Sequence, residues 1–68
     1  MANENNIGEN IKKRRVKLGL SQEEFAQKSG VKYTTLTKIE TGVIKKPSVV
    51  LVTKIAKTLD VSIEDLLK

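Results

Sequence analysis

Cysteine, histidine and tryptophan are absent from this sequence of 68 residues, and only one tyrosine and one phenylalanine are present. Without cysteine the chain forms no disulfide bonds, and without cysteine and histidine a structural zinc site is not expected. We therefore expect no metal and no cofactor. The length leaves room for one domain with one small core, so stability must come from well-packed helices or from a partner subunit.

Long apolar runs are also absent, since no segment approaches the ~20 residues needed to cross a bilayer. The first six residues, MANENN, lack the charged-then-apolar layout of a signal peptide. We expect a cytoplasmic protein with no membrane association, in which residues 1–6 form a flexible polar arm and residues 7–68 form a single domain. Thirteen Lys and Arg against eight Asp and Glu give a net charge of +5. This excess favours a polyanionic partner, although a generic basic protein would show it too.

The first half of the sequence predicts three helices. Asn6 precedes Glu9 by three residues and predicts a helix start, and this helix is expected to run through Leu18 to Gly19. Its apolar stripe comprises Ile7, Ile11 and Leu18. Ser21-Gln22-Glu23-Glu24 is a capping box that starts a second helix ending at Gly30. A third helix is expected from about Tyr33 to Glu40, with Leu36 and Ile39 on its buried side.

The second half predicts two more helices after a loop from Val43 to Pro47. The segment capped by Ser48 is rich in β-branched residues and could pass for a strand, but its apolar spacing and its length of ~11 residues favour a helix. The apolar positions are Val52, Ile55, Ala56 and Leu59. Ser62 caps a short fifth helix carrying Ile63, Leu66 and Leu67. The class expected is therefore all-α, a compact five-helix bundle.

Residues 22–41, QEEFAQKSGVKYTTLTKIET, carry two short helical patterns separated by Gly30. Ala26 suits a close crossing of two helices, and Gly30 allows a sharp turn at positive φ. The second pattern places hydrogen-bonding side chains opposite its apolar residues. Such a helix suits the major groove of DNA, which is ~12 Å wide. An ordinary αα-hairpin is the alternative, but it does not require this combination of residues.

The segment LSQEEFAQKSGVKYTTLTKIETG resembles the helix-turn-helix core of the phage-repressor (Cro/cI, Xre-type) family. KKPSVVLVTKIAKTLDVSIEDLL resembles the last two helices of the same family, so the likeness covers roughly residues 7–67. It implies a five-helix, lambda-repressor-like domain whose third helix reads the major groove, usually as a homodimer.

Three positions depart from the family pattern. Lys32 stands where Ser or Thr normally caps the recognition helix, Ser29 replaces a commonly apolar residue, and Asp60 replaces a common glycine after the fourth helix. Asp tolerates the left-handed conformation less well than glycine. None of these changes threatens the fold, but Lys32 leaves the start of the third helix open.

The outer face of the third helix holds the candidate base contacts. They are Lys32, Tyr33, Thr34, Thr37 and Lys38. Lys38 can donate to guanine O6 and N7, and threonine offers a hydroxyl and a methyl group suited to thymine. A solvated helix face is the alternative. The three threonines argue mildly against it, because β-branched residues are poor helix formers.

Candidate phosphate contacts flank this helix. Gln22 lies in the first turn of the second helix, where the helix N-terminus favours a phosphate oxygen, and the family resemblance supports this role. Lys45 and Lys46 lie in the loop after the third helix, beside a proline, and Thr41 could contribute in the same way. Plain solubility is the alternative for the two lysines.

Arg15 and Glu40 fall near core-facing positions, where an unpaired charge would be costly. The resemblance implies that an arginine at the end of the first helix pairs with the glutamate before the glycine. We therefore expect a structural ion pair between Arg15 and Glu40.

Four apolar residues are candidates for a dimer contact: Val43, Ile44, Val50 and Leu67. Scattered surface apolar residues are the alternative, since these are common. The patch would be small, so the homodimer is expected to form chiefly on DNA.

The function expected is a sequence-specific regulator of transcription that binds double-stranded DNA, with repression by occupying an inverted-repeat operator as its mode. A protein-binding module of the same fold, an antitoxin or an adaptor, is the alternative. An enzyme is not expected, because the sequence has no histidine, no cysteine and no convincing pair of carboxylates. No small-molecule ligand is evident.

Overall fold

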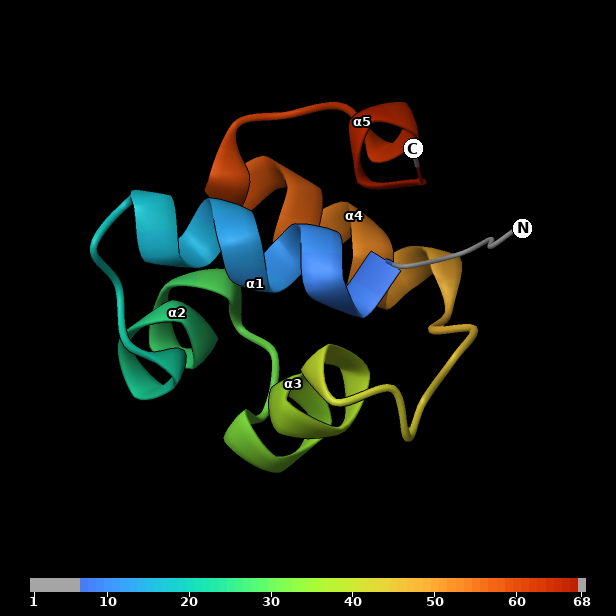
Figure 1. Cartoon of the computed structure of the whole chain (residues 1–68), viewed down its shortest axis with the longest axis horizontal. Coiled ribbons are helices and arrows are strands. Elements are labelled where there is room, and N and C mark those ends of the chain that lie inside the picture. Colours follow the sequence, from blue (N-terminus) through green and yellow to red (C-terminus); the bar gives the residue numbers. More distant parts are fainter. Residues whose placement is uncertain (1–6, 68) are drawn as a thin grey trace.

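The computed structural model describes residues 7–67, which form five α-helices and no strand (Figure 1). The helices are α1 (Ile7–Lys17), α2 (Gln22–Ser29), α3 (Tyr33–Glu40), α4 (Val49–Leu59) and α5 (Ile63–Leu67). The expected all-α, five-helix class is confirmed. The expected N-terminal arm, the capping Asn6 and Lys68 lie outside the described residues.

In Figure 1, helix α1 lies across the front of the molecule, with α4 behind it, α5 above it and α2 and α3 below it. It contacts α3, α4 and α5, while α2 packs between α3 and α4. All five helices and the α2–α3 turn contribute to one core. Its fully buried large side chains are Ile11, Phe25, Leu36, Ile39, Ile55 and Leu66.

Short-range capping explains where several helices begin. The Ser21 side chain accepts from the Glu24 amide, and the Glu24 carboxylate accepts from the Ser21 amide. Ser48 caps α4 through the amide of Leu51, and Ser62 caps α5 through the amide of Asp65. These bonds satisfy backbone amides that have no partner within a helix, as the sequence predicts.

The end of α1 differs from the expectation. The helix ends at Lys17, and Leu18 is 54% exposed instead of joining the apolar stripe. The cause is a Schellman turn: Gly19, at φ 75°, donates to Val16, and the amide of Leu20 donates to the carbonyl of Arg15. This turn directs Leu20, rather than Leu18, onto the core.

The same turn ends α4, with Asp60 in place of the glycine. Asp60 adopts the left-handed conformation at φ 59°, and Val61 donates to the carbonyl of Ala56. Val61 then packs against the core, so an apolar contact directly follows Asp60 in the strained left-handed conformation.

Gly8 sets the closest approach of α1 to α3. A Cβ atom at this position would overlap the carbonyl oxygen of Ile39 and would lie 3.1 Å from the carbonyl oxygen of Glu40. The glycine therefore lets the first turn of α1 rest directly on the backbone at the end of α3. The sequence pattern did not single out this residue.

Candidate nucleic-acid interface

Helices α2 and α3 form one rigid unit through buried contacts at their crossing. Phe25 and Ala26 of α2 and Leu36 and Ile39 of α3 all lie in the core. Gly30 turns the chain between the helices at φ 77°. Side chains on the outer surface of α3 are therefore held in fixed positions relative to α2.

Ser29 has a structural explanation for its departure from the family pattern. It is buried, and its hydroxyl donates to the carbonyl of Ala26 at 3.3 Å and accepts from the amide of Val31 at 3.2 Å. The hydroxyl therefore closes the turn by bonding to backbone groups on both sides of Gly30.

The candidate base contacts lie together on the outer side of α3. Lys32, Tyr33, Thr34 and Lys38 are exposed, and Thr37 is half-buried. The Thr37 hydroxyl donates to the carbonyl of Thr34 at 2.8 Å, which leaves its oxygen to accept a bond from a base. This face combines donors, acceptors and methyl groups over less than three helical turns.

Lys32 occupies the N-cap of α3 in an extended conformation and makes no capping bond with its side chain. This placement resolves the start of the helix, which begins at Tyr33. The first amides of α3 consequently lack the side-chain cap that a serine or threonine would supply.

Arg15 and Glu40 form the expected ion pair. Arg15 Nε donates to Glu40 Oε2 at 2.8 Å, and Nη2 donates to Oε1 at 3.1 Å. The two side chains are 9% and 1% exposed, so this two-pronged pair is nearly withdrawn from water. Arg15 Nη1 also donates to the carbonyl of Leu20 at 2.7 Å, which links the pair to the end of α1.

Gln22 joins this network, which the sequence did not indicate. Its Nε2 donates to Glu40 Oε1 at 2.9 Å. One carboxylate at the end of α3 thus accepts bonds from α1 and from the first turn of α2. The bond fixes the amide of Gln22 and leaves its oxygen and second N–H for another partner.

The other candidate phosphate contacts lie after α3. Thr41, Lys45 and Lys46 are all exposed. The Thr41 hydroxyl donates to the carbonyl of Thr37 at 2.8 Å. The two lysines lie in the loop that follows, where the amide of Ile44 donates to the carbonyl of Lys38 at 3.0 Å and ties the loop to α3.

One of the four candidate dimer residues, Ile44, is partly covered by the core. Ile44 is half-buried and packs against the core, because its loop folds back onto α3. Val43, Val50 and Leu67 are exposed, at 71%, 64% and 54%.

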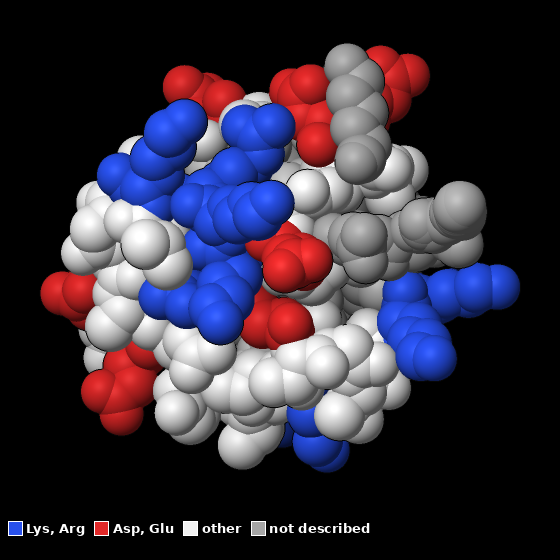
Figure 2. Space-filling model, in the orientation of Figure 1, with Lys and Arg blue, Asp and Glu red and all other residues white. Residues whose placement is uncertain are grey.

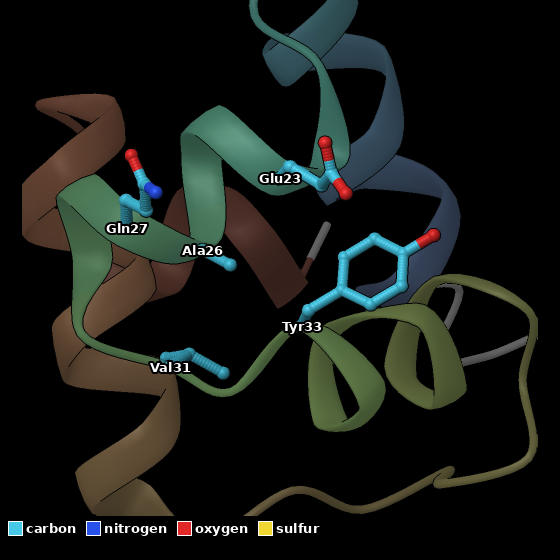
Figure 3. A pocket seen from close by; sticks show the side chains of 5 residues that line it. All are labelled: Glu23, Ala26, Gln27, Val31 and Tyr33. Carbon is cyan, nitrogen blue, oxygen red and sulfur yellow. The ribbon is translucent and has the colours of Figure 1, made fainter.

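A shallow hollow of about 460 Å³ lies between α2 and the first residue of α3. Figure 3 shows Ala26 and Val31 facing it, with Glu23 and the ring of Tyr33 at one end and Gln27 on α2. The hollow places an acidic side chain beside the candidate base contact Tyr33. The nearness of Glu23 to Tyr33 depends on the turn between the helices, so the sequence alone does not indicate it.

The described residues contain neither a cluster of metal ligands nor a membrane-spanning helix. No group of three or more His, Cys, Asp or Glu is placed to hold a metal ion there. None of the five helices is both long and apolar enough to cross a membrane.

The fold and the α2–α3 unit define a helix-turn-helix protein. A family model described as Helix-turn-helix matches residues 11–66, and this chain belongs to that family. The family is one of regulators and not of enzymes, as expected from the sequence.

Curated relatives include the HTH-type transcriptional regulator SinR of Bacillus subtilis (strain 168) and that of Bacillus licheniformis. Each is 39% identical over 61 residues, which is 90% of this chain and 55% of the relative. The chain thus spans about half the length of the curated relatives it matches.

Similar solved structures include SinR in complex with DNA, described as the master regulator for biofilm formation. It matches with a TM-score of 0.88 and 39% identity, over 91% of this chain and 98% of that one. The SinR–SinI protein complex has the same TM-score and identity, over 91% of this chain and 60% of the other. The restriction-modification controller protein C.AhdI from Aeromonas hydrophila matches with a TM-score of 0.84 and 30% identity, over 93% and 94%.

Proposed function

We propose that this chain is a sequence-specific transcriptional regulator that inserts α3 into the major groove of double-stranded DNA. The observation that carries the proposal is the exposed hydrogen-bonding face of α3, fixed by the network of Arg15, Glu40 and Gln22. An α-helix with its side chains is ~10–12 Å in diameter, which suits a groove of ~12 Å width. The structure of the relative SinR with DNA supports the same role.

Base reading falls to the residues from Lys32 to Lys38. Lys38 donates to O6 and N7 of a guanine, while Thr34 and Thr37 contact thymine methyl groups and Tyr33 reaches an adjacent base. Lys32, at the start of the helix, reaches the same groove from its rim. These contacts give sequence preference, because each base pair presents a distinct pattern in the major groove.

Phosphate contacts hold α3 in register. Gln22 binds one backbone phosphate with the amide group that Glu40 has already oriented, and Thr41, Lys45 and Lys46 bind the strand on the other side of α3. Such contacts supply affinity without sequence preference and make binding depend on salt.

Two copies bind an inverted repeat, since one short helix covers only a few base pairs. Val43, Val50 and Leu67 provide an apolar contact between them, with Ile44 holding the loop that carries Val43. The patch is small, so the homodimer forms chiefly on DNA. Occupation of the operator represses transcription in the cytoplasm.

Chemical interference at the bases tests which groove is read. A methyl group on guanine N7 lies in the major groove, and a methyl group on adenine N3 lies in the minor groove. We expect methylated guanine N7 to block binding to a selected duplex, and methylated adenine N3 to have no effect. Interference confined to adenine N3 would contradict the proposal.

Sedimentation with the same duplex tests the assembly. Two copies per palindromic duplex at saturating protein are expected, and a Val43→Ser, Val50→Ser variant should bind with less cooperativity. One stable copy per palindrome would show that the chain acts as a monomer.

A further inference from the structure

The solvent side of α1 carries a basic face that neither the core nor the proposed DNA contact uses. We define the basic α1 face as Lys12, Lys13, Val16 and Lys17, with Glu9 at its edge. These residues recur at helical spacing opposite the buried Ile7, Ile11 and Arg15. All are exposed, and none of the three lysines takes part in an ion pair between described residues.

We call the outer side of α3, with its candidate base contacts from Lys32 to Lys38, the reading face of α3. The basic α1 face is spatially separate from it. In Figures 1 and 2, which share one orientation, α1 lies across the front of the molecule and α3 lies below it. Figure 2 shows Lys and Arg side chains gathered over α1 toward the viewer. A duplex held by α3 therefore leaves this face open.

Its chemistry is more specific than a simple excess of positive charge. Val16 lies among the three lysines and is 58% exposed. A nucleic-acid backbone gains little from contact with an exposed valine. A protein segment that carries both carboxylates and an apolar side chain satisfies the lysines and covers the valine at once.

The length of the face suits a helical segment. A shallow, open hollow of about 510 Å³ runs along the residues from Glu9 to Lys17, which is ~12 Å of helix. A second helix lying against α1 would place an apolar residue over Val16 and acidic residues beside the lysines.

We propose that the basic α1 face docks an acidic amphipathic helix of a partner protein, in which leucine or a similar residue is flanked by Asp or Glu on the same face. The partner and DNA occupy different surfaces, so both bind at once. This docking is independent of the reading role of α3.

The probe is an Ala-based helical peptide that carries Leu flanked by Glu at helical spacing, titrated against the full chain and followed by fluorescence anisotropy. We expect a Kd below about 1 mM. The variant Lys13→Glu, Lys17→Glu should bind at least about tenfold more weakly, because it places like charges together. The variant Val16→Ser, which keeps the charge, should bind about fivefold more weakly because it removes the apolar contact.

A matched control changes the same charges elsewhere. Lys54 and Lys57 are exposed on α4, so Lys54→Glu, Lys57→Glu should leave peptide binding within about twofold of the parent chain. The variant Lys38→Ala should lose DNA affinity and keep peptide binding, which separates this proposal from the function of α3. Circular dichroism establishes that each variant folds, as expected for exposed positions.

Four outcomes would overturn the proposal. The first is no binding of the peptide below about 1 mM. The second is equal binding by Val16→Ser, or by a peptide with Ser in place of Leu, which would reduce the face to charge attraction alone. The third is a loss of operator affinity in Lys13→Glu, Lys17→Glu that is as large as its loss of peptide binding and is absent from the α4 control. This result would assign the face to DNA. The fourth is self-association of the parent chain that this variant abolishes, which would assign the face to a second copy.

Discussion

Glu40 connects three helices through a single carboxylate. It accepts two bonds from Arg15 of α1 and one from Gln22 of α2, and its side chain is 1% exposed. A charge so withdrawn from water is tolerated because its partners surround it. The position of α3, and with it the reading face, therefore depends on bonds made by one residue at the end of that helix.

Removal of either partner of the ion pair leaves an uncompensated buried charge. We expect Arg15→Ala and Glu40→Ala each to lower the free energy of unfolding by ~3–5 kcal/mol, and the double variant to lose less than the sum. Urea unfolding measures the three values. The neighbouring Arg14 serves as a control, and its replacement by Ala should change stability by ~0.5 kcal/mol or less. Strict additivity of the two single changes would reject the coupling.

Lys38 and Lys46 are assigned different contacts, and this difference is measurable. Lys38→Ala should cost ~1–3 kcal/mol on a selected site and relax the preference at one base position. Lys46→Ala should weaken binding to all sequences alike and reduce the slope of log affinity against log salt by about one. Anisotropy titrations over a range of salt concentrations measure both effects. An equal loss on all sequences for both variants would mean that Lys38 reads no base.

Glu24 gives the capping box of α2 a dependence on pH. Hydrogen bonds from the backbone amide and then the side chain of Ser21 hold the pKa of Glu24 below its ordinary value of 4.5. Because the pKa is lower in the folded chain, the stabilisation is present above 4.5 and is lost as pH falls through the folded pKa.

The variant Glu24→Gln tests this dependence through thermal unfolding. The variant should be less stable than the parent at about pH 7. The difference in stability between the two should disappear as the pH falls below about 4.5. Glu23→Gln removes one charge from the same turn and keeps the capping bond, so it should retain the parent's loss of stability in acid. A difference in stability between Glu24→Gln and the parent that stayed constant from neutral to acid pH would contradict the account.

At the scale of helices, α1 meets the backbone of α3 at Gly8, in addition to the side chains that both helices contribute to the core. Gly8 has no side chain to separate them, and the carbonyl oxygens of Ile39 and Glu40 occupy the space. Glu40 takes part in this contact through its carbonyl and in the Arg15 pair through its carboxylate, so the two features fix the same crossing.

The variant Gly8→Ala tests this crossing, because the sign of the change in stability depends on how closely the two helices approach. In an open helix the change from Gly to Ala would stabilise by up to ~1 kcal/mol. Here the new methyl group collides with the backbone of α3, so we expect destabilisation of ~1–3 kcal/mol and weaker DNA binding. Lys17→Gly, at an exposed helical position, measures the ordinary cost of glycine in this helix. A more stable Gly8→Ala variant would show that the helices do not approach so closely.

Features of the helices that depend on local sequence were predicted well. The capping residues Ser21, Ser48 and Ser62 act through bonds to amides three residues away, so the sequence carries the full signal. Leu18 was expected on the buried side of the first helix, but Leu20 packs against the core in its place. The Schellman turn at Gly19 moves this apolar contact beyond the end of the helix.

Features that depend on distant segments could not be predicted. The role of Gly8 needs the position of α3, the half-buried Ile44 needs the fold of its loop, and the bond from Gln22 to Glu40 joins residues 18 apart in the chain. The Arg15–Glu40 pair was expected only because two charges fell on apolar stripes and a family resemblance supplied the pairing.

The whole molecule presents two faces with different proposed partners. The reading face of α3 is assigned to DNA, and the basic α1 face is assigned to an acidic helix. The net charge of +5 attracts polyanions to the molecule as a whole, but it does not choose between sequences. In the proposed function, sequence preference comes from α3 and from the α3 of a second copy in the other half-site.

Selection of bound sites from a pool of randomised duplex DNA tests the central claim most directly. The account predicts enrichment of an inverted repeat whose half-site centres lie ~34 Å apart, one helical turn of the duplex. The enriched motif should lose definition at one position in each half-site when Lys38 is replaced by Ala. Recovery of bound DNA with no enriched motif would contradict the account, because it would leave a basic protein that binds the duplex by charge alone.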